Sequence, residues 1–385
     1  MKVFHIFSKI SNKYQPYNQR LIDNLKRSKE LQIITVSTND TSKPKVNEEI
    51  LHLKRLGFLD KWKGYFNGFF YLFKYEGFSI KNVKDKVKIQ AYSKYAFLLN
   101  NKNAIFHFHN LHKIDQFILK ILKQNDIKFV VSLRGNDISI KPLLNDKVKN
   151  FTIDVLKNAW KIHAVCESLK LDAINVFGID ANKIQVIYRT PNIEDIMNIK
   201  KTKNAVSEIN IVTISRIHWK KCIPESLMAV RQLINQGCAV NYHIIGGFVS
   251  LEEYNKTQFL IQKLKLNSSV VLHGYLEESE FNSILSKMNI FWLTSINEGI
   301  PNVLYFALKS GFPIIASKTD GIPEILKNEI NGLLFSPYNF NDLVEKSKRI
   351  INDEDLRFKL QDNATQTILQ NTDKELKQYL SLYLD

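Results

Sequence analysis

Short, nearly continuous apolar runs alternate with longer amphipathic runs along most of this chain. The first three are "KVFHIFS", "PYNQRLIDNLKRS" and "LQIITVS" at residues 2–8, 16–28 and 31–37, and they predict strand, helix and strand. The alternation resumes after residue 205, with strand-like runs at 209–215, 240–247, 268–275, 290–295 and 312–317. Runs that are apolar at nearly every position are typical of parallel strands covered by helices on both faces. The pattern therefore predicts an α/β fold.

A polar and charged stretch at residues 189–208 separates the two series and is the best candidate for a linker. The chain has 385 residues, of which 44% are hydrophobic, and this is enough to bury two ordinary cores. We therefore predict two domains, at 1–200 and 201–385, with the final helices as candidates to pack back on the first. Two such doubly wound domains would face each other across a central cleft.

Composition narrows the functional classes only slightly. The formal net charge of +16 favours an anionic partner, and nucleotides, nucleic acid and anionic lipid all carry the required charge. No known nucleic-acid module accompanies the charge, so a nucleic-acid partner is not expected. The three cysteines form no CxxC pair, which argues for a reducing compartment. No signal peptide or membrane-length apolar stretch is visible, so we expect a cytosolic protein.

Three loops of the second half follow predicted strands, where α/β sheets bind ligands. Arg216 and Lys221 follow the first strand and have the spacing to flank a diphosphate, although two solvated surface charges would look the same. Gly246 follows the second strand, where either a ligand approach or a tight turn explains a glycine. Glu298 precedes a predicted helix that Pro301 opens, and there an acid can simply stabilise the helix N-terminus.

Taken in order, four motifs closely resemble the C-terminal half of family 4 retaining glycosyltransferases. They are "ISRIHWKK", "VVLHGY", "EGIPNVLYFAL" and "TDGIPEILKNEINGLLF", and the similarity is strong over residues 205–345. The resemblance implies the GT-B fold, with two Rossmann-like domains facing a central cleft. It also implies transfer of a sugar from a nucleotide donor with retention of the anomeric configuration.

By the family's pattern, Arg216 and Lys221 would bind the donor diphosphate, and Glu298 would hydrogen-bond a hydroxyl of the donor sugar. The full donor site implied by the resemblance comprises Arg216, Lys221, Gly246, Gly274, Glu298, Gly299, Ile300, Pro301, Asn302, Val303 and Phe306. The chain departs from the family at Phe306, where a second, ribose-binding acid is usual, and at Cys222, where glycine is common. A phenylalanine cannot accept hydrogen bonds from ribose hydroxyls, so the mode of nucleotide binding is altered.

The N-terminal half is matched mainly by topology and by a few loop residues. In "IFHFHNLH" we expect His107 and His109 to point in opposite directions, so that only one reaches the ligand. His109 matches the family's histidine best, as an acceptor-positioning or electrophilic residue, and a buried, hydrogen-bonded histidine is the alternative. The loop with Arg134, Asn136 and Asp137 corresponds to a His-Gly-x-Asp pattern in relatives. With Arg134 in place of the histidine, the resemblance implies an acceptor site suited to negative charge.

The implied catalytic residues are Glu298, Arg216, Lys221 and His109. No metal site is predicted, because DxD, HExxH and Cys/His frameworks are absent from the sequence. No other cofactor is expected beside the co-substrate, a UDP- or GDP-sugar. Walker, GxGxxG and GxSxG motifs are also missing.

Residues 51–100 interleave aromatic side chains with 10 Lys or Arg against 3 Asp or Glu. Such a segment can lie in an anionic membrane interface, and a core helix with a solvated basic face is the alternative. We therefore predict a glycosyltransferase peripheral on the inner face of the cell membrane, extending a lipid-linked or free glycan for capsule, exopolysaccharide or lipopolysaccharide. Two alternatives stay open, namely a non-catalytic GT-B protein that binds glycan or membrane, and a GT-B sugar-nucleotide epimerase.

Overall fold

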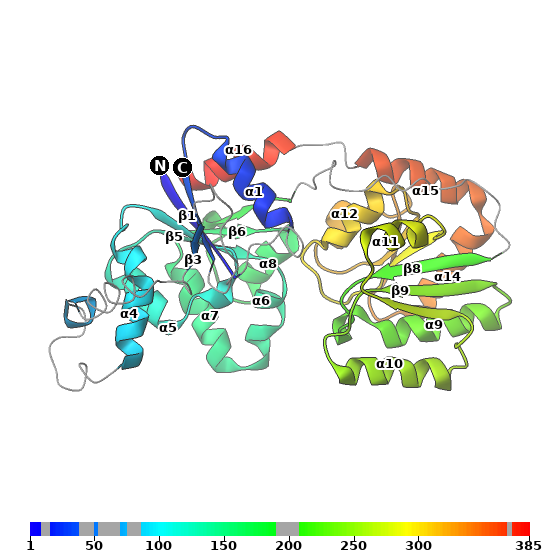
Figure 1. The fold of residues 1–385 in the computed structure, drawn as a ribbon. Helices are drawn as coiled ribbons and strands as arrows, with labels where there is room; N and C mark the ends of the chain where they lie inside the picture. The colour runs from blue at the N-terminus through cyan, green and yellow to red at the C-terminus, as the bar shows by residue number, and fades with distance from the viewer. Residues whose placement is uncertain (9–15, 38–49, 53–69, 75–85, 190–207, 368–371) are drawn as a thin grey trace. The chain divides into compact units, whose positions relative to one another are not determined.

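The computed structural model of the chain describes residues 1–385 except 9–15, 38–49, 53–69, 75–85, 190–207 and 368–371. The described residues form two compact units (Figure 1). The N-terminal unit comprises Met1–Val165, Leu169–Tyr188 and Asp373–Asp385, and the C-terminal unit comprises Cys166–Ser168 and Arg189–Thr372. The linker predicted at 189–208 lies almost wholly outside the described residues.

The N-terminal unit is built on a seven-stranded parallel sheet in the order β3-β2-β1-β4-β5-β6-β7. Its strands are β1 (Lys2–Phe7), β2 (Gln32–Ser37), β3 (Ile50–His52), β4 (Ile105–Phe108), β5 (Phe129–Leu133), β6 (Lys161–Ala164) and β7 (Ile184–Val186). All residues of β4 and β5 are buried, as a central parallel strand covered on both faces requires. The strand order reverses beside β1, because the chain first builds outward to β3 and then continues on the other side from β4.

Helices cover this sheet on both faces (Figure 1). They are α1 (Pro16–Lys26), α4 (Lys86–Leu99), α5 (Gln116–Gln124), α6 (Asn136–Ser139), α7 (Asp146–Asn158), α8 (Glu167–Asn175) and α16 (Thr372–Leu384). Local capping sets where two of them begin. The Asp115 side chain accepts a hydrogen bond from the Ile118 N–H at 2.7 Å, and Asn145 caps α7 in the same way.

The last helix, α16, belongs to the N-terminal unit although it ends the chain. Tyr379, Leu382 and Tyr383 are fully or almost fully buried in the core beside β1 and α1. Glu375 on the same helix accepts hydrogen bonds from the Tyr17 hydroxyl at 2.7 Å and from the Arg20 guanidinium at 3.4 Å. The N-terminal core is therefore completed by residues from the opposite end of the sequence.

The C-terminal unit has a six-stranded parallel sheet in the order β10-β9-β8-β11-β12-β13. Its strands are β8 (Ile209–Ile214), β9 (Val240–Ile245), β10 (Val270–Gly274), β11 (Ile290–Leu293), β12 (Ile314–Ser317) and β13 (Leu333–Phe335). Its helices are α9 (Ile223–Asn235), α10 (Leu251–Lys263), α11 (Glu278–Leu285), α12 (Asn302–Lys309), α13 (Ile322–Ile325), α14 (Phe340–Asn352) and α15 (Glu354–Thr367). The strand order again reverses at the middle of the sheet, between β8 and β11, where ligands of such folds bind.

Two apolar clusters fill the C-terminal unit on opposite sides of its sheet. One centres on α9 and α14 and contains Trp292, and the other contains Phe291 and packs α12. Adjacent side chains of β11 thus point to opposite faces of the sheet, as the alternation along a strand requires. Both units match the predicted parallel α/β architecture, so this prediction is confirmed.

The basic and aromatic segment at 51–100 is only partly described. Phe70 is 61% exposed and Tyr92 is fully buried in α4, but residues 53–69 and 75–85 of the segment fall outside the described ranges. The membrane role predicted for this segment therefore stays a prediction. Within the described parts of the chain, no helix combines the length and the apolar character that crossing a bilayer requires.

Candidate functional site

The loop after β8 carries the two predicted phosphate-binding cations. Arg216 is exposed, whereas the Lys221 side chain is only 14% exposed and forms an ion pair with Glu298, whose side chain is 11% exposed. Lys221 closes a short turn of helix, Trp219–Lys221, directly before α9. The structure thus brings together a lysine and an acid that lie 77 positions apart in the sequence.

Glu298 is held from several sides. Its backbone N–H donates to Asp320 Oδ2 at 2.6 Å, and the same oxygen accepts from the Asn297 side chain at 3.0 Å. The Ile296 N–H donates to the Lys220 carbonyl at 2.9 Å, which ties the loop after β11 to the loop after β8. The carboxylate is therefore positioned by a network of hydrogen bonds.

The side-chain hydroxyls of Thr294 and Ser226 also hold these two loops together. The Thr294 hydroxyl donates to the Lys221 carbonyl at 2.8 Å, and the Ser226 hydroxyl of α9 donates to the Thr294 oxygen at 3.0 Å. Thr294 and Ser226 are buried. Buried hydroxyl groups that are hydrogen-bonded rigidify the segment that carries them, so the backbone at Lys221 is held in place.

Glycines at the ends of β9 and β10 lie beside this loop. Gly246 has a φ of 131°, and a Cβ there would lie 2.0 Å from the Ser215 carbonyl oxygen, so a glycine is required. Its N–H donates to the Gly274 carbonyl at 2.8 Å. The carboxyl ends of β8, β9 and β10 therefore form one edge, and Arg216, Gly246 and Gly274 share it.

The segment from Gly299 to Val303 leads into α12. Gly299, Ile300 and Pro301 are buried, and Val303 packs partly against the core. Asn302 is exposed at the first helical position, and Pro301 is the N-cap residue without a side-chain cap. The first N–H groups of a helix have no acceptor within the helix, so the backbone at 302–303 offers donors to an anion or a hydroxyl.

The two departures from the family pattern have distinct structural settings. Phe306 is half-buried on α12 and its ring lies 5.7 Å from that of Phe281, so it extends the apolar core. Cys222 has left-handed backbone angles, φ 52° and ψ 42°, which are strained for any side chain and favour glycine. Burial raises the pKa of the Cys222 thiol to about 12, so this sulfur is not a nucleophile at neutral pH.

The site is rich in positive charge. Burial lowers the pKa of Lys220, and the neighbouring cations Lys221 and Arg216 lower it further, while Glu298 and Asp320 raise it. Burial lowers the pKa of His218, and Lys220, Arg216 and Lys221 lower it further, against the opposing effect of Glu253. Three cations therefore gather around the carboxylates of Glu298 and Asp320, and this arrangement can neutralise a diphosphate.

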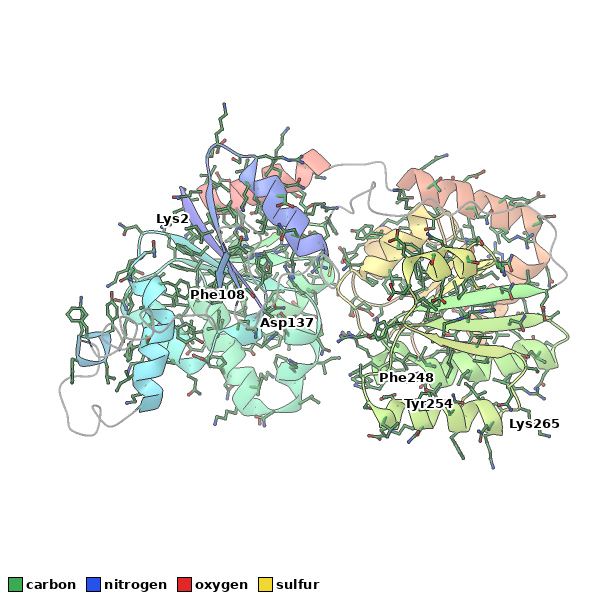
Figure 2. All side chains as sticks on the ribbon, in the orientation of Figure 1. Lys2, Phe108, Asp137, Phe248, Tyr254 and Lys265 are labelled. Carbon is green, nitrogen blue, oxygen red and sulfur yellow. The ribbon has the colours of Figure 1, made fainter. Side chains whose placement is uncertain are left out.

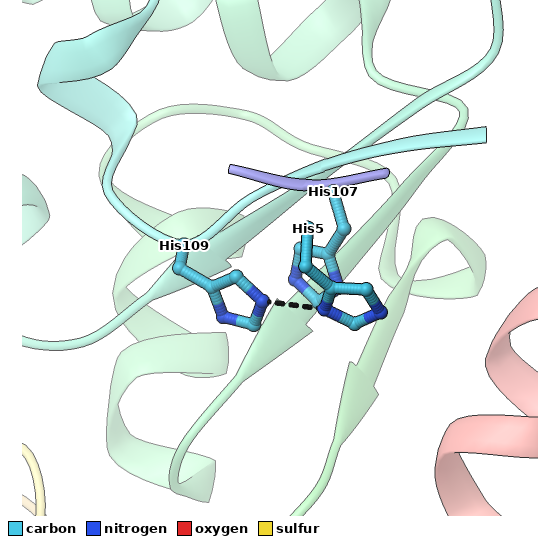
Figure 3. Close-up of side chains that lie close together, drawn as sticks. All are labelled: His5, His107 and His109. Carbon is cyan, nitrogen blue, oxygen red and sulfur yellow. Dashed lines mark hydrogen bonds between the residues drawn. The ribbon is translucent and has the colours of Figure 1, made fainter. Parts of the chain in front are cut away.

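His109, one of the candidate acceptor residues of the N-terminal unit, belongs to a histidine cluster that consists of His5, His107 and His109 (Figure 3). All three side chains are fully buried. His107 and His109 stack with ring centroids 4.1 Å apart, and the prediction that they point in opposite directions is wrong. Side chains alternate along a strand, so positions two apart share a face.

Arg134 fixes the protons of this cluster. A guanidinium can only donate, so His109 Nδ1 accepts from Arg134 at 2.6 Å and the proton of neutral His109 lies on Nε2. That N–H donates to His5 Nδ1 at 2.8 Å, which leaves the His5 proton on Nε2, a buried atom without a partner among the described residues. Both nitrogens of His109 are thus engaged inside the protein, as in the buried-histidine alternative.

A second chain of hydrogen bonds continues from the cluster to α16. His107 Nδ1 lies 2.5 Å from the Tyr383 hydroxyl, and His107 Nε2 lies 2.7 Å from the Ser132 hydroxyl. The spacing of the three imidazoles is compatible with a metal ion, but hydrogen bonds occupy both nitrogens of His107 and of His109. The Arg134 cation also lies against His109. We therefore keep the prediction of no metal here.

Arg134, Asn136 and Asp137 follow β5 on one short loop. The Arg134 side chain is half-buried and also donates to Asn18 Oδ1 at 3.1 Å. Asn136 is exposed at the first position of α6, and Asp137 Oδ1 accepts from the Arg134 N–H at 3.3 Å. These three residues lie together at the carboxyl edge of β5, and His109 lies behind them in the interior.

Sequence reasoning missed several residues that the structure places at these sites. Asp320 anchors the Glu298 backbone, and the signal for it was its position in "TDG" directly after β12. The Asn18 side chain accepts a hydrogen bond from Arg134. Asn18 lies in the first turn of α1, which follows β1, and residues in such positions often bind ligands in α/β folds. His5 joins the cluster from β1, and only the pairing of β1 with β4 could reveal it.

Three comparisons with known proteins bear on this site. Residues 195–367 match the model of a family described as glycosyl transferases group 1. Among curated relatives, the amylovoran biosynthesis glycosyltransferase AmsK of Erwinia amylovora is 29% identical over 56% of this chain and 53% of its own length. The N,N'-diacetylbacillosaminyl-diphospho-undecaprenol alpha-1,3-N-acetylgalactosaminyltransferase of Campylobacter jejuni is 29% identical over 56% of this chain and 54% of its own.

The chain spans about half the length of these two relatives. A third, the N-acetyl-alpha-D-glucosaminyl L-malate synthase of Bacillus anthracis, is 24% identical over 76% of this chain and 78% of its own. Among solved structures, TarM aligns over 100% of this chain and 99% of its own with a TM-score of 0.76 and 14% identity. Anabaena Alr3699/HepE in complex with UDP covers 100% and 99%, with a TM-score of 0.71 and 16% identity. The two structures establish the fold, which is GT-B.

Proposed function

We propose that the chain belongs to the glycosyl transferases group 1 family, whose model matches residues 195–367, and that it transfers a sugar from a nucleotide-sugar donor to a growing glycan. The observation that carries this proposal is the ion pair of Lys221 with Glu298 at the carboxyl edge of the C-terminal sheet, beside exposed Arg216. The two cations can neutralise a diphosphate, and the carboxylate can accept a hydrogen bond from a sugar hydroxyl. The names of the relatives AmsK and the Campylobacter transferase support the same reaction class.

The donor is a UDP- or GDP-sugar in this proposal. Arg216 hydrogen-bonds the leaving diphosphate through its planar fork, and Lys221 adds a second positive charge. Glu298 accepts a hydrogen bond from a hydroxyl of the transferred sugar, and the free N–H groups at the start of α12 bind the sugar or phosphate. With this much positive charge in the protein, the reaction requires no metal ion.

Retention of configuration requires the acceptor hydroxyl to attack on the face from which the diphosphate leaves. The departing diphosphate is then close enough to take the proton of that hydroxyl, so a protein base is not essential. This fits an N-terminal unit in which His109 has both nitrogens engaged. We assign His109 the task of orienting Arg134, and Arg134 the contact with the acceptor.

The acceptor in this proposal is anionic and lipid-linked. Arg134 supplies a fixed cation at the edge of β5, held by Asn18 and His109. Among the relatives, the name of the malate synthase includes malate, which is anionic, and the name of the Campylobacter transferase includes diphospho-undecaprenol. The protein would then work in the cytosol at the inner face of the membrane, in capsule, exopolysaccharide or lipopolysaccharide synthesis.

The test is a transfer assay with Glu298→Gln, which keeps the side-chain shape and removes the anionic acceptor. UDP- and GDP-sugars are screened first by protection of the folded protein against unfolding. With the sugar that protects, wild-type protein should release nucleoside diphosphate and Glu298→Gln should be slower by about 100-fold.

The matched control is Glu345→Gln, because Glu345 on α14 is 66% exposed and lies outside the site. It should transfer at the wild-type rate. Full activity of a folded Glu298→Gln protein would remove Glu298 from the mechanism. Failure of every nucleotide sugar to bind would favour the non-catalytic alternative.

A further inference from the structure

Three large apolar side chains are exposed within one short stretch of the N-terminal unit. Leu143 is 56% exposed, Leu144 is 79% exposed and Val148 is 43% exposed. They lie on the 3-10 turn Lys141–Leu144 and on the first turn of α7, and we call these three residues the apolar tip. A single exposed leucine needs no explanation, whereas exposed apolar side chains that gather at one place indicate a binding surface.

The start of α7 makes little use of Leu144. Asn145 is the N-cap residue, and its side chain accepts hydrogen bonds from the N–H groups of Lys147 at 2.8 Å and of Val148 at 3.4 Å. The residue before an N-cap often packs against an apolar fourth residue of the helix, but here the fourth residue is Lys149. The apolar side chain of Leu144 therefore stays in solvent.

The backbone holds the apolar tip in one shape. Pro142 is buried within the turn, and the Leu143 N–H donates to the Ile140 carbonyl at 3.0 Å. The Asn145 cap fixes the backbone on the other side of Leu144. A surface that already has its bound shape loses little conformational entropy on binding. The tip is therefore preformed for a contact.

The charges near the tip almost cancel, so its apolar side chains must carry any contact. The lysines there are opposed by exposed Asp146, by Asp115, whose side chain caps α5, and by buried Asp137. The whole chain, however, has a net charge of +16 and is attracted to an anionic surface. An apolar tip on a basic protein suits the interface of an anionic bilayer.

The small size of the tip also favours lipid over a protein partner. Three side chains supply much less than the roughly 800 Å² that each partner buries in a stable protein interface. A bilayer needs no matching surface, because its acyl chains can surround a few apolar side chains inserted beside the headgroups.

We propose that the apolar tip inserts into the surface of an anionic lipid bilayer. Leu143 and Leu144 enter beside the acyl chains, and the long side chains of Lys141 and Lys147 keep their ammonium groups among the lipid phosphates. The inference rests on the part of the proposed function that places the protein at a membrane, and it names contact residues outside the 51–100 segment.

The position of the tip in the fold agrees with a lipid-linked acceptor. The tip follows α6, the helix that carries Asp137 (Figure 2), and α6 begins directly after the loop at the carboxyl end of β5. Arg134, the proposed acceptor contact, lies on that loop. A bilayer at the tip would therefore lie near the end of the sheet at which the acceptor binds.

The experiment measures sedimentation of the full chain with vesicles. The probes are vesicles of phosphatidylcholine mixed with phosphatidylglycerol, and vesicles of phosphatidylcholine alone. The wild type should bind the mixed vesicles more tightly, because its net charge adds to the apolar insertion. Leu144→Glu should weaken binding to the mixed vesicles by about tenfold or more, because a leucine no longer leaves water. A wild-type protein that does not bind the mixed vesicles would overturn the proposal.

Leu251→Glu is the matched control. Leu251 is 73% exposed at the start of α10, the helix of the C-terminal unit that carries Tyr254 (Figure 2). This variant adds the same charge at a leucine of similar exposure, so it should change the affinity for mixed vesicles by less than about threefold. Equal losses in Leu144→Glu and Leu251→Glu would show that only net charge matters. Either that result or wild-type binding by Leu144→Glu would overturn the role of the tip.

A second variant removes apolar area without adding charge. Leu143→Ala combined with Leu144→Ala should also weaken binding to mixed vesicles by about tenfold or more, and these exposed positions should leave the melting temperature unchanged. Sedimentation velocity without lipid tests a second copy of the chain as the occupant. A wild-type dimer that Leu144→Glu converts to a monomer would assign the tip to that contact and overturn the proposal.

The outcome is separable from the proposed function, because nucleotide-sugar binding is measured without vesicles. Leu144→Glu should bind the donor like wild type, and a loss of vesicle binding alone supports the tip. A protein that binds vesicles through Leu144 but binds no nucleotide sugar would keep this inference and remove the proposed transfer.

Discussion

The histidine cluster makes the N-terminal unit sensitive to mild acid. Burial lowers the pKa of His5 from 6.5 to about 3, and it lowers the pKa values of His107 and His109 well below 6.5. The Arg134 cation adds to the effect on all three. In the unfolded chain each imidazole returns to an ordinary pKa near 6.5. Below that pH the unfolded state therefore binds protons that the folded state does not.

The direction and size of the effect follow from this difference in protons. The contribution of the neutral histidines to the free energy of unfolding is complete above pH 6.5. It is lost as the pH falls from 6.5 towards the lowered pKa values of the folded state. At pH 5.5, one unit below the unfolded pKa, protonation stabilises the unfolded state by about 1.4 kcal/mol for each histidine, or roughly 4 kcal/mol for the cluster. Domains are stable by only about 5–15 kcal/mol, so the loss should be large.

Hydrogen exchange read by mass spectrometry localises the effect to the right unit. Peptides that cover β1 and β4 should lose roughly 4 kcal/mol of opening free energy between pH 7.5 and 5.5, after correction for the intrinsic exchange rate. His5→Gln can still accept the His109 N–H through its side-chain oxygen, and it should remove about one third of this pH dependence. A loss below about 1 kcal/mol in wild-type β1 and β4 would refute the assignment of buried, neutral histidines.

Four further predictions concern the two sites. Arg216→Ala and Lys221→Ala should each weaken nucleoside diphosphate binding by about 1–3 kcal/mol in calorimetry, and unchanged affinity in both would reject the phosphate assignment. Wild-type protein should bind 2'-deoxy-UDP nearly as well as UDP, whereas Phe306→Glu should prefer UDP by roughly 1.5–3 kcal/mol; strong discrimination by the wild type would mean that another residue replaces the lost acid. Tyr383→Phe should destabilise the N-terminal unit by about 1–3 kcal/mol, because it leaves a nitrogen of the histidine cluster without its partner, and unchanged urea midpoints would contradict the contact. Dialysis against EDTA should leave both the melting temperature and any transfer activity unchanged, and a loss restored by zinc would show that the histidine cluster holds a metal.

The sequence by itself determined the local elements and the ligand edge of the C-terminal unit. Nearly continuous apolar runs predicted the parallel strands, and β8, β9 and β11 begin within the predicted runs at 209–215, 240–247 and 290–295. Glu298 and Lys221 were identified from their loops, because in a parallel sheet every such loop ends at the same edge. The periodicity of the chain therefore predicted the edge of the sheet at which both residues lie, and the family resemblance supplied their roles.

Only the tertiary structure decided which side chains face each other. The pairing of Lys221 with Glu298, the anchoring of Glu298 by Asp320 and the packing of Tyr383 against His107 all join residues that are distant in sequence. A sequence pattern shows which face of a strand or helix is buried, but it does not show which element packs beside it. The strand order is set by how the whole chain buries its apolar surface. The burial of His109 follows from that order. It depends on β4 lying between β1 and β5, and no local run of residues specifies that arrangement.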